Sequence, residues 1–100
     1  PDLYPDFEGN PHSHACPFAR IMEAELVGRL VQVGIRTMSG AQRANAERHG
    51  VEVIDMPAWV RGARPDVRGP VYLSIDIDGL DPAFAPGTCR APGMCTTPRC

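Results

Sequence analysis

The sequence has no surplus of positive charge and no apolar run long enough to span a membrane. Its 10 Lys and Arg residues are outnumbered by 12 Asp and Glu residues, which gives a formal net charge of −2. Nucleic-acid-binding domains gather cations on one face, and a membrane-spanning helix needs about 20 consecutive apolar residues. The first residues also lack the basic region and apolar stretch of a secretory signal. We therefore expect a cytoplasmic protein whose partners include neither nucleic acid nor membrane.

The cysteines follow no pattern that predicts a disulfide framework or a zinc site. Three of the 4 cysteines lie close to the end of the sequence, and no secretory context favours bridges between them. Free thiols are therefore expected. Cys89, Cys95 and Cys100 also lack the paired C-x-x-C spacing that is typical of zinc ligands.

Local signals in the sequence predict alternating helices and short strands. Ser39 and Gln42 have the spacing of a capping box, in which each side chain bonds the backbone amide of the other residue at a helix start. Residues 57–70 are rich in Pro, Gly and Arg, so we expect a loop or a short irregular helix there. In chain order, the regular elements predicted after a loop over 5–16 are a helix from Pro17 that stops at Gly28, a strand over 30–36, a helix over 39–49, and strands over 51–54 and 71–76.

This alternation predicts an α/β fold, a three-layer αβα arrangement in which helices cover both faces of a parallel sheet. Such sheets bind ligands outside the carboxyl ends of their strands. Three short strands and two helices make a thin core for 100 residues. Because the sequence also does not begin with Met, we expect residues 1–100 to be a partial domain, with further elements before Pro1 and after Cys100.

Two carboxylates at the end of the predicted strand over 71–76 carry the strongest chemical signal. Side chains alternate along a strand, so Asp76 and Asp78 are expected to point to the same side. Two such carboxylates repel each other unless a cation lies between them. A calcium loop does not fit, because its twelfth position requires Glu and is Gly87 here. A divalent metal site and a structural turn, in which Asp78 and Asp81 accept hydrogen bonds from backbone amides, both remain open.

Three stretches of the sequence resemble the ureohydrolases, the family of arginases and agmatinases. Residues 74–88 read Ser-Ile-Asp-Ile-Asp-Gly-Leu-Asp-Pro-Ala-Phe-Ala-Pro-Gly-Thr, which is similar to the long signature segment of that family. Residues 31–37 resemble the strand between the two metal motifs, and residues 13–18 resemble the loop that holds the catalytic His. The resemblance covers residues 1 to about 88 and is nearest to bacterial agmatinases, whereas residues 89–100 form an atypical tail.

The resemblance implies a site with two Mn²⁺ ions. Asp2 matches the last carboxylate of the family's Asp-Ala-His-x-Asp motif, and Asp76 and Asp78 match the pair that completes the metal centre. His14 matches the His that carries a proton near the substrate, in preference to His12 two residues before it. Asp81 fits a turn-forming group behind the ligands better than it fits a ligand.

The implied activity is metal-dependent hydrolysis of a guanidino C–N bond, with agmatine converted to putrescine and urea. An arginase, or a ureohydrolase of another guanidino acid, is the alternative within the family. A non-catalytic, degraded metal-binding module is the alternative from another class, because other family ligands and the usual sequence after Thr88 are missing. We expect residues 1–100 to be inactive alone, and the full-length protein to be a homo-oligomer that binds a small guanidino substrate.

Overall fold

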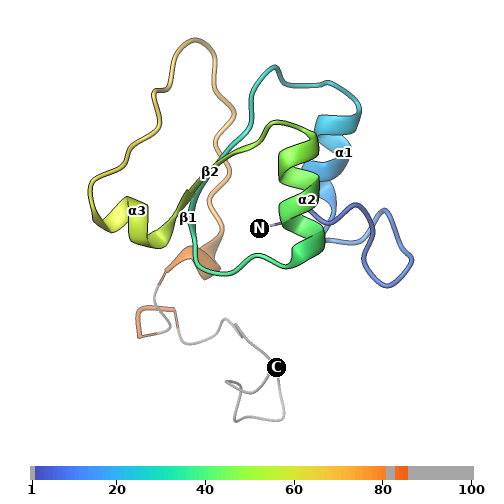
Figure 1. The fold of residues 1–100 in the computed structure, drawn as a ribbon, viewed down its shortest axis with the longest axis horizontal. Helices are drawn as coiled ribbons and strands as arrows, with labels where there is room; N and C mark the ends of the chain where they lie inside the picture. The colour runs from blue at the N-terminus through green and yellow to red at the C-terminus, as the bar shows by residue number, and fades with distance from the viewer. Residues whose placement is uncertain (1, 81–82, 86–100) are drawn as a thin grey trace. The chain divides into compact units, whose positions relative to one another are not determined.

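A computed structural model describes residues 2–80 and 83–85, which fall into two compact units that divide between Asp66 and Val67. No helix within the described residues is long and apolar enough to cross a membrane. The second unit contains the 3-10 helix η1 (Ile77–Gly79). The elements of the first unit are, in chain order, α1 (Pro17–Glu23), β1 (Val31–Ile35), α2 (Gly40–Arg48), β2 (Glu52–Asp55) and α3 (Met56–Val60) (Figure 1).

The two strands of the first unit are parallel, as the alternation of elements predicts. Val31 is paired with Glu52 and Val33 with Ile54, and α2 makes the connection between the strands. Figure 1 shows α1 and α2 on one side of the strand pair and α3 on the other. The α/β class and the placement of helices on both faces of a parallel sheet are therefore confirmed. Because the strands are parallel, the carboxyl ends of β1 and β2 lie at the same edge.

Helix α2 begins and ends where its sequence signals predict. The Ser39 hydroxyl accepts a hydrogen bond from the Gln42 amide at 3.2 Å, and the Gln42 side chain accepts one from the Ser39 amide at 2.9 Å. This capping box satisfies two of the amides that have no partner inside the helix. At the other end Gly50 adopts a φ of 62°, and the Val51 amide donates to the Ala46 carbonyl. That bond is typical of a Schellman motif.

Helix α1 starts at Pro17 as predicted but ends at Glu23, before the expected stop at Gly28. Its end is another Schellman motif, in which the Leu26 amide donates to the Ile21 carbonyl at 3.1 Å. The residue in the left-handed conformation is Glu25, with a φ of 51°. The expectation of a longer helix was wrong because a non-glycine residue makes the turn, and this left no sequence signal.

A bulge interrupts β1 near its carboxyl end. Val33 pairs with Ile54 and Ile35 pairs with Asp55, so one extra residue, Gly34, lies on the β1 side. Gly34 has a φ of 74°, a region that glycine enters freely and other residues enter only at a cost. The bulge redirects the chain just before it leaves the sheet at Arg36.

The predicted strand over 71–76 is absent from the structure. These residues are described, yet they form neither strand nor helix, and their apolar side chains are exposed, with Tyr72 at 83% and Ile75 at 82%. A strand is stable only when a neighbouring backbone takes its amide and carbonyl groups. The described part of the second unit contains no such neighbour, so an apolar, β-branched sequence does not form a strand here.

We expect Gly34→Ala to destabilise the protein by about 1–2 kcal/mol, because a Cβ makes the left-handed backbone unfavourable. Steric contact is not the cause, since the nearest heavy atom to an added Cβ is the Met56 methyl carbon at 3.5 Å. Gly28→Ala is the matched control, because Gly28 lacks a positive φ and has open space around its Cα. Denaturant unfolding of both variants should show a loss only for Gly34→Ala, and equal stabilities would contradict the strained bulge.

Candidate functional site

The segment that carries Asp2 is fixed by side chains from two helices. The Leu3 side chain is fully buried, and its carbonyl accepts a hydrogen bond from Asn45 Nδ2 of α2 at 3.1 Å. Two residues later, the Pro5 carbonyl accepts from Arg20 Nη2 of α1 at 2.8 Å. Residues 2–5 belong to no helix or strand, so these contacts replace the missing regular hydrogen bonds.

The loop that carries His14 is closed at its base by backbone hydrogen bonds. The Tyr4 amide donates to the Ala15 carbonyl at 3.0 Å, and the Phe18 amide donates to the Asp2 carbonyl at 3.2 Å. We call residues 2–18 the anchored loop. Its two ends are thereby held together. Asp2 lies at the first end, and His14 directly precedes Ala15 near the second end.

Aromatic contacts order the middle of the anchored loop. The His14 ring lies 6.1 Å from the Phe7 ring, and the Phe7 ring packs edge-on against Tyr4 at 5.5 Å. His14 is nevertheless exposed. His12 is also exposed, and no ring contact of His12 is found among the described residues. The His14 ring therefore has an aromatic neighbour, while its assignment as the catalytic His stays a prediction.

Cys16 also belongs to the anchored loop and is a free thiol, as expected. It is fully buried, and its Sγ donates to the Asn10 carbonyl at 3.7 Å. Cys16 is therefore one of the core residues of the first unit. The other three cysteines, with the rest of the predicted tail over 89–100, lie outside the described residues.

Asp76 and Asp78 are exposed and lie at the start of η1. Asp76 Oδ1 accepts a hydrogen bond from the Asp78 amide at 3.1 Å, which begins the 3-10 turn. The strand whose alternation was expected to place both carboxylates on one side is absent, and Asp78 lies in η1 instead. A carboxylate that accepts from a backbone amide is what the alternative of a structural turn predicts. The acceptor is Asp76, however, whereas Asp78 and Asp81 were expected to accept. The assignment of Asp76 and Asp78 as metal ligands stays a prediction, and Asp81 lies outside the described residues.

The three predicted ligands suit Mn²⁺ by chemistry. Carboxylate oxygens are the donors that hard divalent cations prefer. However, no group of three or more His, Cys, Asp or Glu side chains converges anywhere within residues 2–80 and 83–85. Asp2 and the pair at 76 and 78 lie in different units. The assignment of one metal centre to Asp2, Asp76 and Asp78 stays a prediction.

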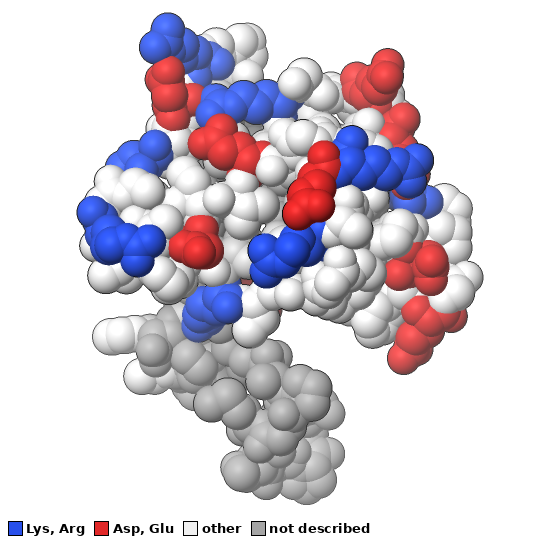
Figure 2. Space-filling model, in the orientation of Figure 1, with Lys and Arg blue, Asp and Glu red and all other residues white. Residues whose placement is uncertain are grey.

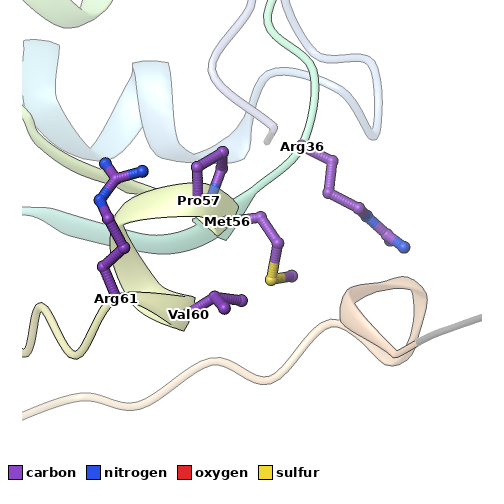
Figure 3. Close-up of a pocket in the computed structure, with 5 residues that line it drawn as sticks. All are labelled: Arg36, Met56, Pro57, Val60 and Arg61. Carbon is purple, nitrogen blue, oxygen red and sulfur yellow. The ribbon is translucent and has the colours of Figure 1, made fainter.

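A pocket of about 570 Å³ opens beside α3, where β1 and β2 end. Arg36 directly follows β1, and the other lining residues belong to α3 or directly follow it. The missed residues follow directly after β2, and that position was their only signal. Figure 3 shows the Arg36 and Arg61 side chains extending in different directions, so their guanidinium groups do not converge on one ligand. The lining residues are Arg36, Met56, Pro57, Val60 and Arg61.

Charges of both signs are interspersed on the face seen in Figure 2, without a large patch of one sign. Among the described residues, Arg20 pairs with Glu23 and Arg29 pairs with Glu52. Arg64 stacks on the Trp59 ring, with Cζ 3.7 Å from its centroid. These contacts lie at the surface of the first unit.

Comparison with known proteins identifies the family. The sequence model of the Arginase family matches residues 1–96, which is nearly the whole chain. The match includes the anchored loop, the β1–α2–β2 unit and the segment with Asp76 and Asp78. The chain belongs to the arginase family, as its resemblance to the ureohydrolases predicts.

The chain is similar to several curated members of this family. It is 51% identical to a mitochondrial arginase of Medicago truncatula, over 87% of this chain and 28% of that protein. It is 41% identical to a guanidinopropionase of Pseudomonas aeruginosa and 37% identical to an N(1)-aminopropylagmatine ureohydrolase of Thermus thermophilus, over 82% and 85% of this chain and 30% of each protein. The chain therefore spans less than a third of the length of these relatives.

Two expectations change in the light of these relatives. The predicted cytoplasmic location is contradicted, because similar arginases of Medicago truncatula and Arabidopsis thaliana are mitochondrial, and another from Arabidopsis thaliana is chloroplastic or mitochondrial. The preference for agmatine over arginine is not confirmed, because the relatives fit the arginase alternative better. The short motifs that carry the resemblance are shared by different ureohydrolases, so they contain little that separates one substrate from another.

Proposed function

We propose that the full-length protein hydrolyses a guanidino C–N bond and releases urea, with arginine rather than agmatine as its substrate. The observation that carries this proposal is the 51% identity to a plant arginase across most of the chain. Identity to the guanidinopropionase and to the aminopropylagmatine ureohydrolase is lower, at 41% and 37%. A homo-oligomeric assembly remains part of the proposal for the full-length protein.

The proposed reaction needs an activated water and a proton for the departing amine. The guanidinium carbon is a poor electrophile because resonance spreads its charge. A pair of bound Mn²⁺ ions would supply a hydroxide near neutral pH, and Asp2, Asp76 and Asp78 are the residues proposed to contribute to holding them. His14 is proposed to give the proton to the departing nitrogen, since imidazole exchanges protons near neutral pH. Its exposure beside Phe7 leaves the imidazole accessible to a substrate.

Substrate choice is the direct test of the proposed function. The full-length protein, supplied with Mn²⁺, should release urea from arginine with a kcat/KM at least about tenfold above that for agmatine or 3-guanidinopropionate, a difference of roughly 1.4 kcal/mol. Faster release from agmatine would return the assignment to an agmatinase. Release from none of the three would favour a non-catalytic module. Residues 1–100 alone should release no urea.

Replacement of His14 tests the proposed proton donor. His14→Ala in the full-length protein should lower kcat by about 100-fold or more, because the departing amine loses its acid. His12→Ala is the matched control, since His12 is an exposed residue of the same loop. Its kcat should stay within about twofold of the wild type, as surface substitutions usually have small effects. Equal losses in both variants would contradict the choice of His14.

A further inference from the structure

We propose that Asn45 is a positioning residue for the reaction, acting through the anchored loop. This inference rests on the proposed function, in which Asp2 and His14 take part. Asn45 itself lies on α2, far from both residues in the sequence, and its Nδ2 bonds the Leu3 carbonyl across 42 residues. Neither the motifs of the sequence nor the comparisons assign it a role.

The Asn45–Leu3 hydrogen bond is protected from water. Asn45 is 4% exposed and Leu3 is 0% exposed. A buried carbonyl that loses its donor cannot turn to solvent for another one, so the chain must move or leave the carbonyl unsatisfied. The bond therefore fixes where the backbone of Leu3 lies, with little tolerance for displacement.

Displacement of Leu3 would reach both proposed site residues. Asp2 is the preceding residue, and its carbonyl accepts from the Phe18 amide. Tyr4 is the following residue, and its amide holds the Ala15 carbonyl next to His14. A shift at Leu3 would therefore displace Asp2 through the chain and His14 through the bond between Tyr4 and Ala15. A small misplacement of reacting groups is enough to lower a rate strongly.

The choice of residue at this position also indicates a specific need. Asn is a poor helix former, because its side chain competes for backbone hydrogen bonds. Both neighbours in α2, Ala44 and Ala46, are good helix formers. Alanine would suit the helix at position 45 as well, so the contact that Asn45 makes outside α2 accounts for its presence better than helix stability does.

Two substitutions in the full-length protein test this role. Asn45→Asp keeps the size of the side chain but places a carboxylate oxygen against the Leu3 carbonyl. Asn45→Ala removes the donor without added repulsion and guards against misfolding of the first variant. Ser39→Ala is the matched control, because it weakens the start of the same helix by removing the capping hydroxyl, which accepts from the Gln42 amide, and leaves the Asn45–Leu3 bond intact. The readouts are kcat and KM for urea release, and amide hydrogen exchange over residues 2–18.

We expect both Asn45 variants to lower kcat by about 10- to 100-fold, the range typical of residues that orient reactive groups. KM should change by less than about threefold if substrate binding is unaffected, and amide exchange in the anchored loop should be faster by at least about tenfold if its closure is loosened. Ser39→Ala should leave kcat within about twofold of the wild type if stability alone changes.

Unchanged exchange over residues 2–18 in the Asn45 variants would overturn the positioning role, as would a loss of kcat no greater than that of Ser39→Ala. Failure of both variants to fold would assign Asn45 to fold stability and would also overturn it. An inactive wild-type protein would instead refute the proposed function, and the exchange measurement would still decide whether Asn45 holds the loop.

Discussion

The parallel pairing of β1 and β2 is the constraint on which the first unit depends. Two parallel strands cannot be joined by a tight turn, so the chain must cross from one end of the pair to the other. Helix α2 makes this crossing, and its capping box and Schellman motif fix where it starts and stops. The position of α2 then determines where Asn45 meets the Leu3 carbonyl. The strand pairing thus determines, through α2, where residues 2–5 lie, although they belong to no helix or strand.

The anchored loop shows how a segment that lies mostly outside helices and strands can still be held in place. The Leu3 side chain fills a small core, while hydrogen bonds from Asn45 and Arg20 satisfy the carbonyls on either side of Tyr4. The backbone that bears exposed His14 and half-buried Asp2 is therefore held in place. Functional residues often lie on loops that a rigid scaffold positions, and here the scaffold consists of α1 and α2.

Several features encoded within a few residues could be predicted from the sequence, whereas two that depend on distant partners could not. The capping box at Ser39 and the start of α1 at Pro17 are local, and both predictions are confirmed. The strand over 71–76 requires a partner backbone, so its apolar sequence alone was misleading. The Asn45–Leu3 bond joins residues 42 positions apart and left no motif. The family could be predicted because its signature is also local, whereas the choice between arginine and agmatine could not.

The proposed chemistry finally requires Asp2, Asp76 and Asp78 to contribute to one metal centre. In the described residues, Asp76 is engaged by the Asp78 amide, and Asp2 belongs to the other unit. A crystal structure of the full-length protein with Mn²⁺, with the metal located by its anomalous scattering, is the most direct test. Carboxylate oxygens of all three residues should coordinate the same metal centre, with His14 facing it. Manganese bound without Asp2, or Asp76 still turned to the Asp78 amide and away from the metal, would contradict it.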